Sequence, residues 1–451
     1  MTRVGVLGLA RSGRAAAQLA LRQGMSVYAT DASSGEELRR TAAELQKQGA
    51  AVDVGSHSAA ALAECDVMIV SPGIPPTAPI LRESAVAGVP RISELEFASR
   101  ALRSPMIAIT GTNGKSTTTA MTSHILSGCG FTAPAAGNIG TPLSEIAMRE
   151  PQPDWVVVEA SSFQLADIDT FRPAVGVVTN LAPDHLDRYP DVATYYADKA
   201  RLFDNADGDS IWVLNAEDEA VLALPGEADG ARLVFRVNTQ LGGSERGGHI
   251  DAAGRLAVRL DAGDEVLLHR SELSVMGSHN EANALAAAIA AMCAGASADC
   301  TASGLRTFRG LAHRLEVVAT RDGIVWINDS KATNIDSTLV ALRSMTRPTV
   351  LLLGGRHKGE PYTRLLDEIE RAVTAVIAYG EAGAEVEKDL TGSVPVIRVT
   401  GGFEDVMAQA RSLAVSGGAV LLSPACSSYD MFRNYEERGD AFRRLVLESA
   451  A

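Results

Sequence analysis

The sequence predicts an α/β protein of three domains, which we place at residues 1–93, 94–310 and 311–451. Strand-like and helix-like stretches alternate in the first and third of these ranges, which is typical of parallel sheets covered by helices. In the second range, an apolar strand runs into a glycine-rich turn and then a helix, near residue 110. A chain of 451 residues also exceeds what one hydrophobic core usually holds, so two or three domains are expected.

The first domain is expected to bind a nucleotide. Residues 8–13, GLARSG, form a weakened dinucleotide fingerprint in which Ala10 replaces the middle glycine. Asp31 ends the second strand, where an acid commonly contacts a ribose or base edge, and Ser71 follows a further strand at the same edge. An ordinary structural strand–helix turn is the alternative.

Residues 107–119, IAITGTNGKSTTT, predict a phosphate cradle. Backbone N–H groups of a glycine-rich turn at a helix N-terminus point at phosphate oxygens. Lys115 would reach the β- and γ-phosphates, and the Ser116 hydroxyl could ligate Mg²⁺. The usual P-loop has a glycine five places before Gly114, where this chain has Ile109, so the loop is a short variant. A plain surface strand–turn–helix is the alternative.

Three further polar residues lie at strand ends or on the following helix of the middle range. Glu159 ends the apolar strand 155–159, where a carboxylate can hold the Mg²⁺ of a nucleotide; a surface acid is the alternative. His185 lies on the loop after the strand 174–179. Lys199 is one of six lysines among 41 basic residues, which favours a chemical need for an amine over a surface cation.

The rest of the middle range offers weaker signals. Residues 231–275 are expected to form an antiparallel flap without a recognisable motif. Asn280 and Asn283 stand at the entrance of an apolar helix, where they either cap it or read a base edge.

The third domain again places polar residues after its expected strands, at 349–353, 375–379 and 419–422. These polar residues are Asp329, Lys331, Thr333, Lys358 and the run SPACSS at 423–428. We expect the carboxyl edges of all three domains to face a shared cleft.

Composition excludes some classes of function. A formal net charge of −14 argues against a nucleic-acid partner. The five cysteines are odd in number and have no C-x-x-C spacing, which predicts a reducing compartment without disulfides or structural zinc. No signal peptide is apparent, and the Ala-rich stretch 284–291 is too short to cross a bilayer. We therefore expect a cytoplasmic protein without a membrane partner.

Ten motifs occur in one order: GTNGKST, GNIG, VEASSFQL, NLAPDHLDRY, DKARLF, HNEANALAA, HRLE, NDSKATN, GGRHKG and SPACSSYDMF. With them the chain resembles the Mur ligases of peptidoglycan synthesis along nearly its whole length. The P-loop with Ile109 is similar to theirs and to that of folylpolyglutamate synthases. NDSKATN and SPACSSYDMF are most similar to the members that add D-glutamate.

The resemblance implies a Rossmann-like N-terminal domain for a uridine nucleotide, a central P-loop ATPase domain with a mainly parallel sheet, and a C-terminal Rossmann-like domain that closes on it. It implies that ATP phosphorylates the carboxylate of UDP-N-acetylmuramoyl-L-alanine to an acyl phosphate, which the amine of D-glutamate attacks. ATP and Mg²⁺, at two sites, are the implied cofactors. We expect a monomer whose partners are these small molecules.

The same resemblance assigns residues. Those implied to bind ATP are Gly111, Thr112, Asn113, Gly114, Lys115, Ser116, Thr117, Asn280, Asn283, Arg314 and Asp329. Those implied to hold metal are Ser116, Glu159, His185 and a carbamylated Lys199. Those implied to act in catalysis are Lys115, His185, Lys199 and Lys331. Those implied to contact the UDP-linked substrate are Ser12, Asp31, Ser71, Asn138 and Gln164. Those implied to receive D-glutamate are Thr333, Lys358, Ser428 and Tyr435.

The chain departs from the family pattern at two places. Ala32-Ser33 replaces a Thr-Arg pair after Asp31, which argues against an arginine contact to uracil. Tyr435 replaces a more familiar Phe and adds a hydroxyl to a stacking wall.

Other functions stay open from the sequence. A sister Mur ligase or a folylpolyglutamate synthase-like ligase would share the P-loop. A P-loop switch or transport ATPase would not need polar loops in the third domain. The hypothesis of an NAD-dependent oxidoreductase is supported only by the motif GLARSG.

Overall fold

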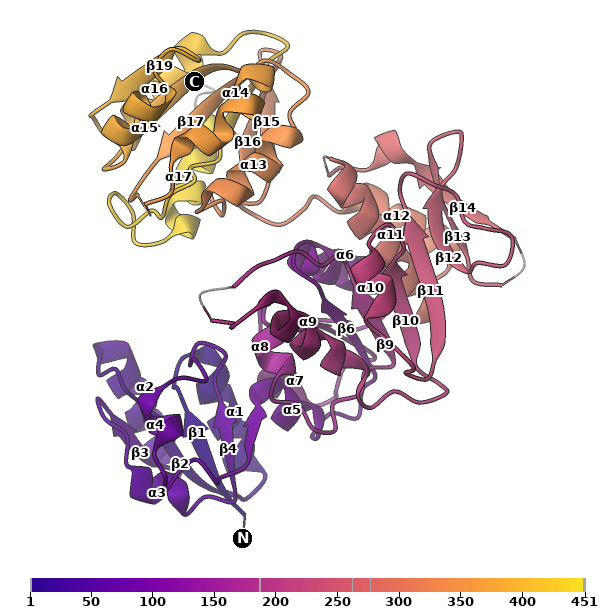
Figure 1. The fold of residues 1–451 in the computed structure, drawn as a ribbon, viewed down its shortest axis with the longest axis vertical. Helices are drawn as coiled ribbons and strands as arrows, with labels where there is room; N and C mark the ends of the chain where they lie inside the picture. Colours follow the sequence, from indigo (N-terminus) through magenta and orange to yellow (C-terminus); the bar gives the residue numbers. More distant parts are fainter. Residues whose placement is uncertain (1, 186–187, 262, 276, 358, 449–451) are drawn as a thin grey trace. The chain divides into compact units, whose positions relative to one another are not determined.

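The computed structural model describes residues 2–185, 188–261, 263–275, 277–357 and 359–448, and its strands form three separate sheets (Figure 1). The chain divides into two compact units. The first unit comprises residues 1–273 and 279–308 and holds the first two sheets, and the second comprises residues 274–278 and 309–451.

The first sheet is wholly parallel, in the order β3-β2-β1-β4-β5. Its strands are β1 (Arg3–Leu7), β2 (Ser26–Asp31), β3 (Ala51–Val54), β4 (Val67–Val70) and β5 (Arg91–Ser93), with helices α1 (Arg11–Arg22), α2 (Glu36–Lys47), α3 (Ala59–Ala63) and α4 (Pro79–Arg82). The turn from β1 into α1 requires Gly13, because a Cβ atom there would lie 1.7 Å from the Gly8 carbonyl oxygen. The predicted alternation of strands and helices is confirmed.

The second sheet has nine strands in the order β14-β13-β12-β11-β10-β9-β6-β8-β7 (Figure 1). They are β6 (Met106–Thr110), β7 (Ala135–Gly137), β8 (Val156–Glu159), β9 (Val175–Val178), β10 (Ile211–Asn215), β11 (Ala231–Arg236), β12 (Gly247–Ile250), β13 (Arg255–Arg259) and β14 (Glu265–His269). The helices are α5 (Glu94–Ser99), α6 (Lys115–Gly128), α7 (Leu143–Ala147), α8 (Ser162–Leu165), α9 (Val192–Ala200), α10 (Glu219–Ala223), α11 (Ser278–Cys293) and α12 (Ala298–Thr307).

The expectation of a separate antiparallel flap at 231–275 was partly wrong. β11 pairs in parallel with β10, and β12 in parallel with β11, so both continue the second sheet. Only β13 and β14 are antiparallel. The buried side chains of Leu233 and Phe235 explain the difference, since they make β11 part of the core.

The expectation of no disulfide was also wrong, because Cys129 and Cys300 are bonded. Cys129 caps the end of α6 and Cys300 lies in α12, and these helices pack so closely that a Cβ atom on Gly304 would lie 2.9 Å from Ile125 Cα. The partners are 171 positions apart, so spacing gave no sign of their proximity.

The third sheet lies in the second unit, in the order β15-β16-β20-β17-β18-β19. Its strands are β15 (Glu316–Arg321), β16 (Ile324–Asn328), β17 (Thr349–Gly354), β18 (Val373–Tyr379), β19 (Val396–Val399) and β20 (Ala419–Leu422). The helices are α13 (Ile335–Arg343), α14 (Leu366–Ala372), α15 (Gly383–Leu390), α16 (Phe403–Leu413) and α17 (Tyr435–Glu448). β15 and β16 form an antiparallel hairpin, and the other pairings are parallel.

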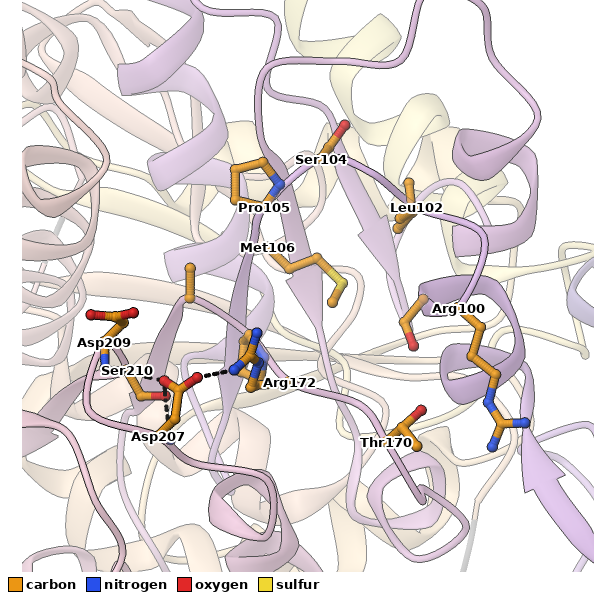
Figure 2. Close-up of a pocket in the computed structure, with 13 residues that line it drawn as sticks. Arg100, Leu102, Ser104, Pro105, Met106, Thr170, Arg172, Asp207, Asp209 and Ser210 are labelled. Atoms are coloured by element: carbon orange, nitrogen blue, oxygen red, sulfur yellow. Dashed lines mark hydrogen bonds and ion pairs between the residues drawn. The ribbon is translucent and has the colours of Figure 1, made fainter.

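A cavity of about 390 Å³ opens at the amino edge of the second sheet, where Met106, Ala174 and Ser210 lie at or just before the starts of β6, β9 and β10 (Figure 2). Two arginines line this cavity, and one of them, Arg172, forms an ion pair with Asp207. This cavity lies at the opposite end of β6 from residues 111–117.

No helix in the described part of the chain is long and apolar enough to span a membrane.

Candidate active site

The glycine-rich turn after β6 has the geometry of a phosphate cradle. Gly111 and Gly114 have φ of 137° and 83°, in the region that favours glycine. A Cβ atom would lie 2.1 Å from Thr179 Oγ1 at Gly111, and 2.3 Å from Asn283 Oδ1 at Gly114. α6 begins directly afterwards at Lys115, so the N–H groups of its first turn are available to an anion.

Lys115 and Ser116 stand at the start of α6. Lys115 Nζ donates to the carbonyl oxygens of Gly111, at 3.0 Å, and Thr112, at 2.8 Å, so the ammonium group lies over the turn itself. The side chains of Ser116 and Thr117 are buried. The predicted cluster of loop amides, lysine and hydroxyl is therefore present in one place.

Glu159 ends β8, the strand next to β6, and its carboxylate is almost wholly buried. Asn138 Nδ2 donates to Glu159 Oε1 at 2.7 Å, whereas Oε2 has no hydrogen-bond partner among the described residues. A buried carboxylate oxygen without a donor is costly unless something else satisfies it. A divalent cation would satisfy this oxygen.

Lys199 in α9 is 1% exposed and its Nζ donates to the Gly111 carbonyl oxygen at 2.8 Å. The lysine therefore lies against the P-loop. Burial, and then the nearby charge of Lys115, lower the pKa of Lys199 to about 7. A large part of this amine is accordingly neutral at neutral pH, and the neutral amine is the form that reacts with CO₂.

His185 lies on the loop between β9 and α9, with φ of 55°. Its ring packs near those of Phe163, at 5.0 Å between centroids, and Tyr195, at 6.0 Å. Leu186 and Asp187 lie outside the described residues. Within the described ranges, no three His, Cys, Asp or Glu side chains gather as a metal site, so the predicted second site depends on Lys199 as a ligand.

Asn280 and Asn283 lie at the start of α11, where both side chains are buried. Asn283 Nδ2 donates to Asn280 Oδ1 at 3.0 Å, and Asn283 Oδ1 accepts from Thr118 Oγ1 at 3.2 Å. Asn283 thus supports the P-loop helix from behind, a positioning role that the sequence did not indicate.

The predicted contacts to the UDP-linked substrate are divided between two places. Ser12, Asp31 and Ser71 lie at the carboxyl edge of the first sheet, as expected. Asp31 accepts from the backbone N–H groups of Leu9 and Ser33, both at 2.8 Å, so its carboxylate shapes the turn after β1. Asn138 instead bonds to Glu159.

A cavity of about 270 Å³ lies between this edge and helices α8 and α9, and Ser71 and Gln164 both line it. Gln164 Nε2 is buried without a partner among the described residues. Arg188 also lines the cavity, with its guanidinium 3.9 Å from the centre of the Phe163 ring. Arg188 and Phe163 were not predicted as site residues, although they lie in the motifs NLAPDHLDRY and VEASSFQL.

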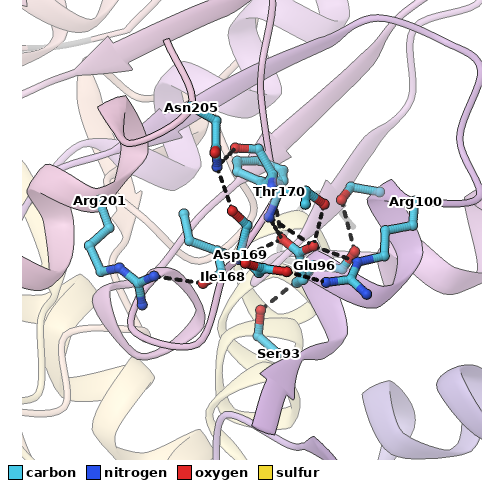
Figure 3. Close-up of polar contacts among 10 residues, drawn as sticks. Ser93, Glu96, Arg100, Ile168, Asp169, Thr170, Arg201 and Asn205 are labelled. Atoms are coloured by element: carbon cyan, nitrogen blue, oxygen red, sulfur yellow. Dashed lines mark hydrogen bonds and ion pairs between the residues drawn. The ribbon is translucent and has the colours of Figure 1, made fainter. Parts of the chain in front are cut away.

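A buried carboxylate joins α5 to the loop that follows α8 (Figure 3). Glu96 in α5, just after the first sheet, accepts from the backbone N–H groups of Asp169, Thr170 and Phe171, at 2.8 to 3.1 Å, and from Arg100 Nε at 2.6 Å. Burial alone would raise the pKa of Glu96, but these hydrogen bonds hold it below its ordinary value.

The remaining predicted site residues lie in the second unit. Asp329 follows β16 and accepts from Ser423 Oγ at 2.8 Å and from the Leu315 N–H at 3.1 Å. Burial raises the pKa of Asp329 to about 7, and Arg314 is among the groups that oppose this shift. Lys331 Nζ lies 5.9 Å from the centre of the Tyr435 ring.

The residues predicted to receive D-glutamate follow the same strand ends. Thr333 lies after β16, Ser428 is buried after β20, and Tyr435 begins α17. Lys358 lies outside the described residues.

Comparison with known proteins places these sites in a family. Three family models match in order: a Mur ligase MurD-like N-terminal domain at residues 2–93, a Mur ligase middle domain at 109–291, and a Mur ligase glutamate ligase domain at 313–426. A solved pseudomurein peptide ligase type C from Methanothermus fervidus shares the fold, with a TM-score of 0.59 and 18% identity, and the match covers 100% of both chains.

Relatives with a UDP-N-acetylmuramoylalanine–D-glutamate ligase name match at full length. That of Salinibacter ruber is 42% identical, over 99% of this chain and 97% of its own. That of Anaeromyxobacter dehalogenans is also 42% identical, over 100% of this chain and 98% of its own. Because these matches cover the whole chain and the three models follow in order, the chain belongs to the Mur ligase family of ATP-dependent amide ligases.

Proposed function

We propose that this protein adds D-glutamate to UDP-N-acetylmuramoyl-L-alanine, with ATP as the energy source, in peptidoglycan precursor synthesis. The observation that carries the proposal is the 42% identity, over essentially the whole chain, to two relatives whose names state this ligation. The P-loop, Glu159 and Lys199 supply the matching chemistry in one place.

The proposed reaction needs no protein nucleophile. The terminal carboxylate of the muramoyl-alanine substrate attacks the γ-phosphorus of ATP, which gives an acyl phosphate and ADP. The amine of D-glutamate then attacks the acyl carbon, and the tetrahedral intermediate expels inorganic phosphate as the amide forms. The protein contributes positioning and charge stabilisation between anionic reactants.

The first unit would bind the nucleotide. The amides of residues 111–117 and Lys115 would hold the β- and γ-phosphates, with Asn280 and Asn283 toward adenine. Ser116 and Glu159 would hold one Mg²⁺, whose charge lowers the cost of bringing a carboxylate to the γ-phosphate.

Lys199 and His185 would hold a second Mg²⁺. A carbamate on Lys199 Nζ replaces a cation with a carboxylate-like ligand, and the burial that lowers the pKa of this lysine favours the reactive neutral amine. Arginine cannot form this carbamate, which explains why this arginine-rich chain has a lysine here.

The substrates would occupy the remaining sites. Ser12, Asp31, Ser71 and Gln164 would contact the UDP-linked precursor, with Ser71 and Gln164 in the 270 Å³ cavity. In the second unit, Thr333, Lys358, Ser428 and Tyr435 would receive D-glutamate. Arg314 and Asp329 would approach the ATP ribose and phosphates, and Lys331 would stabilise phosphate charge. The domain boundaries at 93/94 and 310/311 belong to the same proposal.

We also propose that the protein works in the cytoplasm as a monomer, without nucleic-acid or membrane partners, because ATP and UDP-linked precursors are found there.

An acceptor panel tests the proposal. The purified chain is given ATP, Mg²⁺ and UDP-N-acetylmuramoyl-L-alanine with D-glutamate, L-glutamate, meso-diaminopimelate or L-lysine, and ADP release and product mass are measured. We expect an amide product with D-glutamate alone. A product only with another amino acid would identify a sister ligase, and ADP release without any acceptor would indicate an ATPase switch. A separate reaction supplies a folate and L-glutamate in place of the muramoyl substrate, and a product there would identify a folylpolyglutamate synthase.

A further inference from the structure

Arg438 in α17 is a buried cation to which the proposed reaction assigns no role. Its side chain is 0% exposed. Its Nε donates to Ser330 Oγ at 2.9 Å, and its Nη2 donates to the carbonyl oxygens of Ser330, at 2.9 Å, and Cys426, at 3.1 Å. Nη1 has no partner of good hydrogen-bond geometry in the described ranges, although the guanidinium interacts with the neutral Tyr379 hydroxyl. No described carboxylate forms an ion pair with it. Buried arginines normally have an acidic partner, so this charge requires an explanation.

The guanidinium reaches the carboxyl ends of three adjacent strands. Ser330 follows β16, Cys426 follows β20, and a Cβ atom on Gly355, just after β17, would lie 3.1 Å from Arg438 Nη1. These strands are neighbours in the sheet, in the order β16-β20-β17. The loops after β17 and β20 are also joined directly, since the Arg356 N–H donates to the Ser427 carbonyl oxygen at 2.8 Å. One side chain thus connects the three loops at this edge.

The same loops carry the proposed acceptor residues. Thr333 lies three positions after Ser330, and Ser428 lies two positions after Cys426. Tyr435 lies on α17, three positions before Arg438, and its carbonyl oxygen accepts from Ser330 Oγ at 2.8 Å. A chain of two hydrogen bonds, from Arg438 Nε to Ser330 Oγ and on to Tyr435, therefore fixes the wall that Tyr435 provides.

We propose that Arg438 is a positioning residue for the acceptor amino acid: it holds the three loops in register and supplies a fixed positive charge that the carboxylates of D-glutamate offset. This inference rests on the proposed function and extends it to a residue that does not touch substrate. A fixed charge in a poorly polarisable interior acts strongly on an anion nearby and needs no reorganisation when the ligand arrives.

Asp329 interacts electrostatically with Arg438 but does not fully neutralise its charge. Arg438 is among the groups that lower the pKa of Asp329, yet burial still raises that pKa to about 7. At neutral pH, Asp329 is therefore protonated in a substantial fraction of the molecules, and the positive charge of Arg438 is left for a further anion.

The test compares Arg438→Met, which removes the charge, with Arg438→Lys, which keeps it. Initial rates give KM for D-glutamate, KM for ATP and kcat. We expect Arg438→Met to raise KM for D-glutamate by about 10-fold or more, which corresponds to about 1.4 kcal/mol of lost attraction between the fixed charge and the carboxylates. KM for ATP should stay within about 2-fold. Arg438→Lys should recover part of the loss. Arg444→Met, at an exposed position on the same helix, is the matched control and should behave as wild type.

Ser330→Ala keeps the charge and removes the hydroxyl between Arg438 and Tyr435, so it tests the positioning role even if Arg438→Met does not fold. We expect a smaller rise in KM for D-glutamate, again without a change in KM for ATP. The proposal is overturned if Arg438→Met and Ser330→Ala lower only kcat or thermal stability, or if KM for ATP rises equally.

The wild-type acceptor panel separates this inference from the proposed function. If the wild type uses another amino acid, the proposed substrate is wrong, and the Arg438 and Ser330 variants are then measured with that amino acid. If the wild type uses D-glutamate and KM for it does not change in the variants, the proposed function stands and only the role of Arg438 fails.

Discussion

At the scale of single residues, Lys199 and Glu159 support the proposal that the site holds cations around a phosphate. Glu159 presents a buried oxygen without a donor, and Lys199 is held against the P-loop with its pKa lowered to about 7. Both groups are unfavourable in isolation, because burial penalises a charge that is not offset. In the proposed function, a cation held by Glu159 would offset its buried charge, and a carbamate on Lys199 would replace the buried ammonium group by a metal ligand.

Lys199→Ala should therefore abolish most of the ligation. We expect kcat to fall by roughly 100-fold, the size of effect seen when a preorganised charged group is removed from an active site. A small carboxylic acid such as acetate should restore part of the activity, because it can take the place of the carbamate. Rates with and without added acetate measure this.

Lys47→Ala is the matched control, because Lys47 is exposed on α2. Lys199→Arg should be as inactive as Lys199→Ala, since it keeps the charge but cannot form a carbamate. Unchanged turnover in Lys199→Ala would refute the metal-bridging role.

Site residues could be predicted from the sequence where a short local motif or a rare residue type marks them. The P-loop is contiguous, and Lys199 stands out among only six lysines. Arg438 could not be predicted, since EERGDAFRR has the pattern of a charged surface helix and only tertiary packing buries one arginine of it. The bond between Asn138 and Glu159 likewise depends on the pairing of β7 with β8.

At the scale of elements, the P-loop and α11 fit together through one glycine. Gly114 has φ of 83°, and a side chain there would collide with Asn283, which also accepts from Thr118 in α6. The turn, the P-loop helix and the helix behind it are therefore positioned by the same contact.

Gly114→Ala should consequently weaken ATP binding by 10-fold or more and lower the melting temperature. The backbone strain alone costs on the order of 1 kcal/mol, and the collision with Asn283 adds to it. Isothermal titration with an ATP analogue measures the affinity, and calorimetry measures the melting temperature. Gly128→Ala is the control: Gly128 ends α6 with nothing within 4 Å of an added Cβ atom, so ATP affinity should not change. Equal behaviour of the two variants would contradict the role of this contact.

The sequence was enough to predict which segments form strands and which form helices. The pairing of the strands was less predictable. The apolar strands and the helices between them gave the α/β class, because local periodicity reports which faces are buried. The parallel continuation of the second sheet through β11 and β12 was missed, since Gly-rich turns looked like hairpin connections.

At the scale of the whole molecule, Glu96 ties the first sheet to the second within the first unit. Both acids of the short helix α5, Glu94 and Glu96, are fully buried. Glu96 gathers the N–H groups of residues 169–171, and the Ser93 N–H donates to the Asp167 carbonyl oxygen at 2.7 Å. The shared cleft expected for all three domains stays a prediction.

Glu96→Gln should destabilise the first unit by about 3 kcal/mol at pH 7, because an amide nitrogen would face donors that need an acceptor. The pKa of Glu96 is lowered in the folded state, so its contribution is fully present above its ordinary pKa and is lost as the pH falls through the lowered value. The difference between wild type and variant should therefore shrink in acid. Urea unfolding at several pH values measures it.

Glu64→Gln serves as the control, since Glu64 is mostly exposed in its ion pair with Arg3 and should contribute little. A Glu96→Gln variant as stable as wild type at pH 7 would contradict the proposed junction.

The bond between Cys129 and Cys300 also changes the shape of the chain after it unfolds. With the bond intact, the denatured polypeptide is not linear: the segment 129–300 is a closed ring that carries two tails, residues 1–128 and 301–451. Such a ring is more compact than an open coil of equal mass. The oxidised chain should therefore run ahead of the reduced chain on a denaturing gel without reductant, and Cys300→Ser should remove the faster band.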